Sequence, residues 1–178
     1  MTTKTRLILK TIYTFSFIIE IFLFISGLLF TFGSLALINP ENKFSNNLKI
    51  IVGSQNLTAH SPAIVIVLTL IAALVFIIAL IMVMIVMRKL IKNMLQKQYF
   101  IAQNLRYLKR ILQLLIFAIF EEVIVDIISS LITLMNGKSL KIDFTPLIIS
   151  LIFVAIFYTT YTLLKNGIVI KKENDDFI

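Results

Sequence analysis

The stretch from Arg88 to Arg110, RKLIKNMLQKQYFIAQNLRYLKR, decides the fold of this chain. It contains no acidic residue and seven basic ones: Arg88, Lys89, Lys92, Lys97, Arg106, Lys109 and Arg110. Long apolar runs lie on both sides of it. A segment with this charge cannot cross a bilayer, and in a short connection it stays cytoplasmic. The stretch therefore separates two membrane helices, sets the orientation of the chain and offers a docking surface for a partner.

The composition is that of an integral membrane protein. Of the 178 residues, 59% are hydrophobic and 15% are charged, whereas a soluble domain is nearer half apolar and a quarter charged. Apolar runs of about 18 residues or more with few charges predict membrane spans. Because no polar segment is long enough to fold by itself, we expect residues 1–178 to form one membrane domain.

Charge and residue usage exclude several classes of function. The net charge of +8 would suggest nucleic acid in a soluble protein, but here the positive-inside rule and attraction to anionic lipids explain it. We therefore expect no direct nucleic-acid binding. The chain has no cysteine and a single histidine, His60, which predicts neither thiol chemistry nor a metal site. Abundant Ile, Lys and Asn without Trp are typical of an AT-rich bacterial genome, so we expect a bacterial cytoplasmic membrane protein.

Four apolar runs predict an all-α bundle of four transmembrane helices. We place the spans at about 11–38, 63–87, 111–135 and 146–164. The three prolines, Pro40, Pro62 and Pro146, flank these runs, where proline ends or opens a helix. Apolar residues recur at helical spacing within 88–110, which predicts either helical extensions of the neighbouring spans or a helix lying in the interface. The second span has no charge, so we expect it to be the most lipid-exposed helix.

The distribution of basic residues predicts the topology. Lys and Arg total 13 in the N-terminal segment, in 88–110 and from Lys165 onward, but only 4 in the two other loops. Under the positive-inside rule, both termini and the 88–110 segment are cytoplasmic.

Four carboxyl groups lie within the predicted spans: Glu20, Glu121, Glu122 and Asp126. A charge at the bilayer centre costs about 2.5–3.5 kcal/mol on insertion scales, so such groups rarely face lipid. Glu20 and Glu121 each lie about 15 Å from the cytoplasmic charges by helical rise, and no basic residue is expected at that depth. We therefore expect spans one and three to face each other across a polar interior, with several of these acids protonated.

The polar residues of the first and third spans support such an interior, because on each of these two spans they share one face. On the third span this stripe comprises Glu122, Asp126, Ser129 and Thr133, and on the first it comprises Tyr13, Ser16, Glu20, Gly27, Thr31 and Ser34. The stripe could bind a proton, a cation or a ligand, or it could only join helices through hydrogen bonds. No nucleophile, metal set or phosphate-binding loop accompanies the acids, so we expect neither an enzyme nor a cofactor.

Two segments resemble a known family. The sequence from Tyr99 to Ile111, YFIAQNLRYLKRI, resembles an F-x-x-x-N-x-x-x-L-x-x-I pattern, and the tail KKENDDFI resembles a K-x-E-N-D-x-x-I ending. Together with four spans, these features are similar to the bacterial membrane proteins grouped as domain of unknown function 2975. The resemblance implies a membrane partner of a small helix-turn-helix regulator. It directs attention to Phe100, Asn104, Glu173, Asp175 and Asp176, although Asn104 could simply cap a helix and the tail could simply be solvated.

Three functions remain open from the sequence. The first is a regulatory or signalling membrane protein that binds a small cytoplasmic transcription regulator through the basic segment and the acidic tail. The second is a proton or cation pathway, or a transporter subunit, that uses the intramembrane carboxylates; this function would require a homo-oligomer or a partner subunit. The third is an immunity protein against membrane-active peptides.

Overall fold

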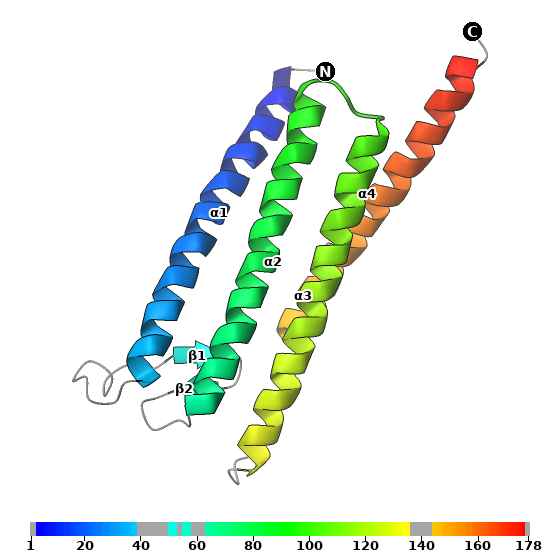
Figure 1. Cartoon of the computed structure of the whole chain (residues 1–178). Helices are drawn as coiled ribbons and strands as arrows, with labels where there is room; N and C mark the ends of the chain where they lie inside the picture. The colour runs from blue at the N-terminus through cyan, green and yellow to red at the C-terminus, as the bar shows by residue number, and fades with distance from the viewer. Residues whose placement is uncertain (1–2, 39–49, 53–54, 58–62, 136–143, 177–178) are drawn as a thin grey trace.

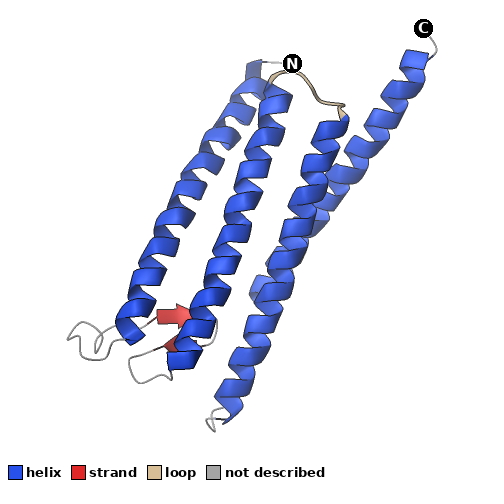
Figure 2. Cartoon of the chain, viewed as in Figure 1, coloured by secondary structure: helices blue, strands red, loops and turns tan. Residues whose placement is uncertain are grey.

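The structure, a computed structural model, describes residues 3–38, 50–52, 55–57, 63–135 and 144–176 (Figure 1). Within them lie four long helices and one short hairpin (Figure 2): α1 (Thr3–Ile38), β1 (Ile50–Val52), β2 (Gln55–Leu57), α2 (Ala63–Leu95), α3 (Ala102–Met135) and α4 (Thr145–Asp176). Our interpretations of Pro40, His60, Pro62 and the loop 136–143 fall outside the described residues.

Each predicted span lies within one helix, but every helix continues beyond its span. Residues 3–10, 88–95, 102–110 and 165–176 are helical as well. Of the two alternatives for the 88–110 segment, the helical extensions are confirmed. At about 1.5 Å per residue, helices of 32 to 36 residues are longer than the hydrocarbon core, which is about 30 Å thick.

Three of the helices, α1, α2 and α4, are long and apolar enough to cross a membrane. The helix α3 is similar in length, with 34 residues, but every 18-residue stretch of it contains at least three charged residues. The charges come from its basic start and from its three acids. Charge, rather than length, therefore distinguishes α3 from the other helices.

The helices pack in chain order: α1 on α2, α2 on α3, and α3 on α4. The seam on α4 shows the pattern of this packing. The residues between the seam positions are exposed as far as Asn166. The seam positions themselves are partly or fully buried and recur every three or four residues: Leu147, Ser150, Val154, Phe157, Tyr161, Leu164 and Ile168. A repeat of 3.5 residues is that of helices that cross at a shallow angle.

The helix α2 is the most enclosed of the four, so our expectation that it would be the most lipid-exposed was wrong. It packs against both α1 and α3 and supplies half of the main core cluster, which comprises Val83, Val86, Leu90, Leu108, Ile111 and Leu164. A second cluster joins Leu37 of α1 to Ile66 of α2 near the hairpin. Uniform hydrophobicity gave no sign of which side faces lipid, and a helix without charges can equally pack in the centre.

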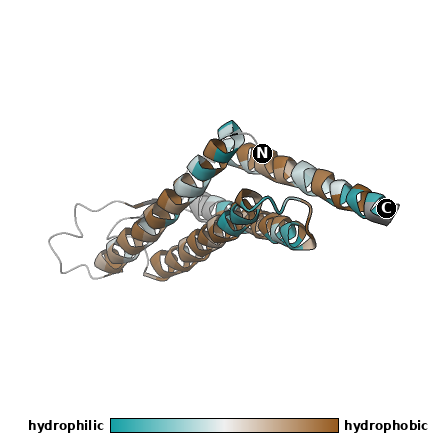
Figure 3. Ribbon diagram, turned by 90° about the horizontal axis from the view of Figure 1, so that it is seen from above, coloured by the Kyte–Doolittle hydropathy of each residue, from teal (hydrophilic) through white to brown (hydrophobic). Residues whose placement is uncertain are grey.

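The helices consist mostly of hydrophobic residues, as the colours of the ribbon in Figure 3 show, and many of the large ones are exposed. Large side chains such as Phe22 (68% exposed) and Phe32 (69% exposed) point away from the neighbouring helices. Soluble proteins rarely expose contiguous apolar patches of this extent. The surface therefore fits hydrocarbon, and the chain is a membrane protein.

The hairpin of β1 and β2 was not predicted. Its strands pair antiparallel, with Ile50 opposite Leu57. A signal was present, since the β-branched run Ile50-Ile51-Val52 is followed by Gly53-Ser54, a dipeptide that often separates paired strands.

Candidate functional site

The connection between α2 and α3 is short and lies at the same end of the molecule as both termini (Figure 1). We call residues 96–101 the connector. The helix α2 ends in a Schellman motif, in which Gln98 N–H donates to Asn93 C=O at 3.0 Å and Lys97 N–H donates to Met94 C=O at 3.0 Å. This motif requires a left-handed residue, and Lys97 has a φ of 62°. The connector thus has a defined path rather than a variable one.

The side chain of Asn104 holds this path in place. It is fully buried, at 0% exposure. Its Nδ2 group donates to the carbonyl oxygens of Gln98 (2.6 Å) and Tyr99 (2.9 Å), and its Oδ1 atom accepts from Asn93 Nδ2 at 2.8 Å. An N-cap side chain instead accepts from a backbone N–H, so the capping alternative for Asn104 was wrong. Asn104 links the end of α2, the connector and the start of α3.

The aromatic ring of Phe100 packs against α4 at Gly167. A Cβ atom at Gly167 would overlap the ring, lying only 2.8 Å from Phe100 Cδ1. Contacts of that length essentially never occur for a real Cβ, so the ring occupies the space that any other residue at 167 would need. The other side of the ring remains accessible, since Phe100 is 47% exposed. Phe100 is therefore first of all an internal contact between the connector and α4.

Basic residues surround this end of the protein. Except for Arg88, the basic residues predicted for docking are all exposed: Lys89, Lys92, Lys97, Arg106, Lys109 and Arg110. Two other helices contribute further exposed charges here: Lys4, Arg6 and Lys10 on α1, and Lys165, Lys171 and Lys172 on α4. The colours of Figure 3 show the hydrophilic residues gathered in these regions. Such a surface attracts anionic lipid headgroups and acidic partners.

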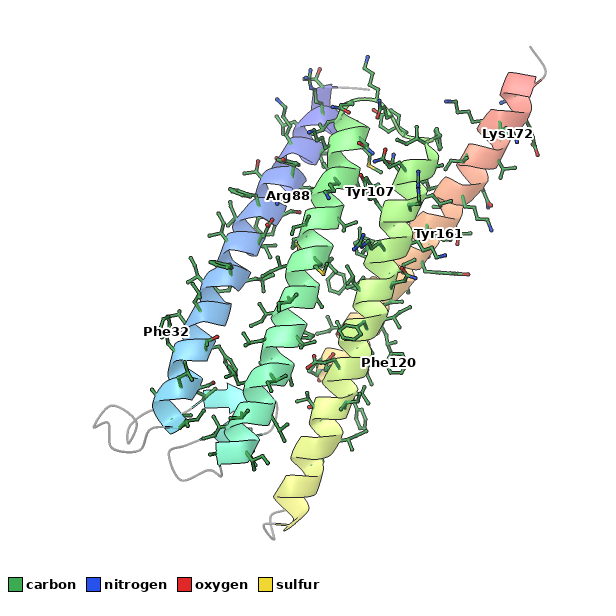
Figure 4. The ribbon with its side chains drawn as sticks, in the orientation of Figure 1. Phe32, Arg88, Tyr107, Phe120, Tyr161 and Lys172 are labelled. Atoms are coloured by element: carbon green, nitrogen blue, oxygen red, sulfur yellow. The ribbon has the colours of Figure 1, made fainter. Side chains whose placement is uncertain are left out.

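The tail is the helical end of α4. Its final turns extend away from the other helices in Figure 1, and Figure 4 labels Lys172 on this projecting part. Glu173 is exposed. Asp175 and Asp176 lie in the same helix, but their side chains are outside the described part of the chain. The tail thus presents a basic pair followed by acids at the end that carries the connector.

Arg88 does not belong to the exposed basic surface. Its guanidinium forms an ion pair with Glu20 of α1, with Nη2 at 2.5 Å from Oε2, and both side chains are 21% exposed. It also lies 5.1 Å from the centre of the Phe17 ring, a distance at which a cation interacts with an aromatic face. Figure 4 shows Arg88 on α2 beside α1. Our expectation that no basic residue would reach the depth of Glu20 was therefore wrong.

The predicted polar interior between the first and third spans is also not formed. The polar stripe of α1 does lie on one packed face, since Ser16, Gly27 and Ser34 are buried. That face packs against α2, however, and Gly27 meets Ile77 of α2. The helix α1 has no extended contact with α3. Glu20 is consequently separated from the acids of α3.

The three acids of α3 lie in different surroundings. Glu122 is half-buried and accepts a hydrogen bond from Ser150 Oγ of α4 at 3.3 Å. Glu121 is half-buried too, while Asp126 is exposed. Ser129 and Thr133, the other members of the predicted stripe, have side chains outside the described residues. Among the described residues, no three carboxylate, histidine or cysteine side chains are grouped as metal ligands.

Sequence reasoning missed two members of the connector site, Asn93 and Gly167. Both had a weak signal. Asn93 is a polar residue among the apolar positions at the end of α2, and Gly167 follows Asn166 just beyond the predicted end of the fourth span at residue 164. Neither signal shows which residue each position contacts. The role of Asn93 depends on its contact with Asn104, and that of Gly167 on its contact with Phe100.

Comparisons with known proteins returned nothing: no family model, no curated protein and no solved structure matches this chain. The resemblance to domain of unknown function 2975 stays a prediction.

Proposed function

We propose that this chain is a four-span protein of the bacterial cytoplasmic membrane that serves as the membrane partner of a small cytoplasmic helix-turn-helix regulator. The docking surface comprises the connector, the end of α2, the start of α3 and the tail of α4. Anionic lipid headgroups bind the basic residues around its edge. Chemistry at this surface is recognition rather than catalysis.

Packing supports a fourth span. The helix α3 packs on α2 and on α4, both of which are apolar enough to cross a membrane. A helix of 34 residues held between two spanning helices passes through the same hydrocarbon layer. Its outer side is apolar, with Phe117, Phe120 and Ile124 each at least half exposed.

The charge pattern supports cytoplasmic termini. The connector end carries basic residues on all four helices, and the described chain brings both termini to that end (Figure 1). Basic residues near helix ends mark the cytoplasmic side. Both termini and the connector then face the cytoplasm, where a soluble regulator is found.

The observation that supports a docking role most directly is the link between the connector and α4. Asn104 holds the connector through two backbone carbonyls, and Phe100 in that connector packs on Gly167 of α4. The connector, with Lys97, is therefore joined to α4 at the point where the tail that carries Glu173 begins. Adjacent positive and negative areas favour a partner that is itself bipolar, because complementary charge gives specificity and raises the association rate.

A pull-down of the tagged protein from native membranes, followed by mass spectrometry, tests this function. We expect a small helix-turn-helix protein to be recovered with the wild-type chain. Neutralising the tail acids with Glu173→Gln, Asp175→Asn and Asp176→Asn should abolish recovery, as should neutralising Lys97, Arg106 and Lys109. Neutralising Lys4, Arg6 and Lys10 removes the same charge elsewhere and should leave recovery intact. Equal recovery with all three variants would contradict the docking surface.

A proton or cation pathway is the second candidate, because the acids of α3 have few partners. Among the described side chains, only Ser150 is recorded as bonded to Glu122, and Asp126 is exposed on a span. The pathway would need a second copy or a partner subunit to cover Asp126. It predicts cation flux in liposomes that is lost with Glu122→Gln and Asp126→Asn. Glu20→Gln provides the control, since Glu20 is paired with Arg88; equal flux in the double variant would exclude the pathway.

A further inference from the structure

We infer that Phe100 and Gly167 form a joint that sets the direction in which the tail of α4 leaves the protein. Both are positioning residues, and neither needs to touch the partner. The inference rests on the proposed function only in that it makes the tail a docking element; the joint itself is a property of the isolated protein.

The joint exists because Gly167 lacks a side chain. A Cβ atom there would lie 2.8 Å from Phe100 Cδ1 and 3.4 Å from Cζ. Gly167 lies inside a continuous helix, 32 residues long, where glycine is less favourable than alanine. Its backbone has an ordinary helical conformation, so space for the ring, and not a positive φ, is the structural reason for glycine at this position.

The joint lies at the last place where the rest of the protein contacts α4. Ile168 is half-buried and packs against the main core cluster, whereas the side chains from Val169 to Asn174 are all exposed. In the described part of the tail, residues 169–174, no side chain has a hydrogen bond or ion pair with another helix. A small change at residue 167 is therefore amplified along the tail to Glu173.

The opposite side of the joint is held firmly. Asn104 donates to the carbonyl oxygen of Tyr99 at 2.9 Å, and Tyr99 directly precedes Phe100. Asn93 of α2 donates to the same asparagine. Contacts therefore run without a break from α2 through Asn104 and Phe100 to α4, so a movement between the membrane helices would reach the tail through this ring.

A double-mutant cycle on the purified protein tests the joint. In an open helical site, Gly→Ala stabilises. We expect Gly167→Ala to lower the unfolding midpoint in the wild-type background, because the new Cβ displaces the ring. In the Phe100→Ala background the same substitution should raise the midpoint. The control is Gly27→Ala, whose Cβ would meet Ile77 at an ordinary 3.5 Å; its effect should be identical in both backgrounds.

The direction of the tail is measured separately by double electron–electron resonance spectroscopy, which gives the distance between two spin labels. The chain has no cysteine, so spin labels at Arg106→Cys and Lys172→Cys attach only there. We expect Gly167→Ala and Phe100→Ala each to shift or broaden the distance distribution, and Gly27→Ala to leave it unchanged. Unchanged distances, or a midpoint that Gly167→Ala raises equally in both backgrounds, would overturn the joint. Both measurements use the isolated protein, so loss of the proposed regulator binding would leave their outcome unaffected.

Discussion

Replacing Asn104 with alanine should destabilise the protein more than any other single polar substitution at the connector. The substitution removes three hydrogen bonds, two donated to the carbonyls of Gln98 and Tyr99 and one accepted from Asn93. A typical hydrogen bond contributes about 1 kcal/mol net, so the expected loss is about 3 kcal/mol. That is roughly a hundredfold change in the unfolding equilibrium, because each 1.4 kcal/mol is a factor of about ten. The side chain is fully buried, so solvent provides little replacement.

Titration with SDS in mixed micelles, followed by circular dichroism, measures this free energy of unfolding. Two variants calibrate the result. Asn93→Ala removes only one of the three bonds and should cost about 1 kcal/mol. Gln103→Ala removes an exposed bond to the Tyr107 hydroxyl and should cost about 0.5 kcal/mol or less.

Asn104→Asp separates the donor role from the acceptor role. The carboxylate can still accept from Asn93, but it cannot donate to Gln98 or Tyr99 and would bring its charge towards their carbonyl oxygens. We expect it to be at least as destabilising as alanine. If Asn104→Ala were no more destabilising than Asn93→Ala, the two carbonyl bonds would contribute nothing, and the reasoning about the connector would be refuted.

Three further outcomes follow from other contacts. Glu20→Ala or Arg88→Ala should each destabilise the protein by about 1–3 kcal/mol. This loss is smaller than the roughly 3–5 kcal/mol for a fully buried pair, because both side chains are 21% exposed. A variant in which the two charges are exchanged should recover part of the loss in the same titration, and no recovery would argue against the pairing. Lys97→Gly should raise the free energy of unfolding by up to about 1 kcal/mol, because φ at this position is 62°, and Lys97→Val should lower it. We expect a change in stability of less than about 0.5 kcal/mol from each of the substitutions Thr159→Val, Thr160→Val and Thr162→Val. The hydroxyls of these exposed threonines donate to carbonyl oxygens of their own helix. A larger loss would indicate a partner on that face of α4.

Many residues of the site were identified from the sequence, but the residues that they contact were not. Phe100 and Asn104 were identified from a short pattern, and the basic residues from their number. Glu20 was recognised as requiring a partner, yet the expected partner was a stripe on the third span. The actual partner is Arg88, which had been assigned to the docking surface. The side chain of an arginine is long enough to return along its helix towards a buried acid, and residue counting along one helix does not show that reach.

The sequence by itself determined that this is a helical membrane protein with basic helix ends around one connection. These properties are local: apolar length, helical period and the position of charges depend only on neighbouring residues. The tertiary structure alone decided that α2 lies between α1 and α3, that Glu20 is paired with Arg88, and that Phe100 packs on Gly167. A stripe of polar or small residues shows that a helix face is packed, but it does not show against which helix, because many neighbours can bury the same face. That choice depends on how all four helices fit together.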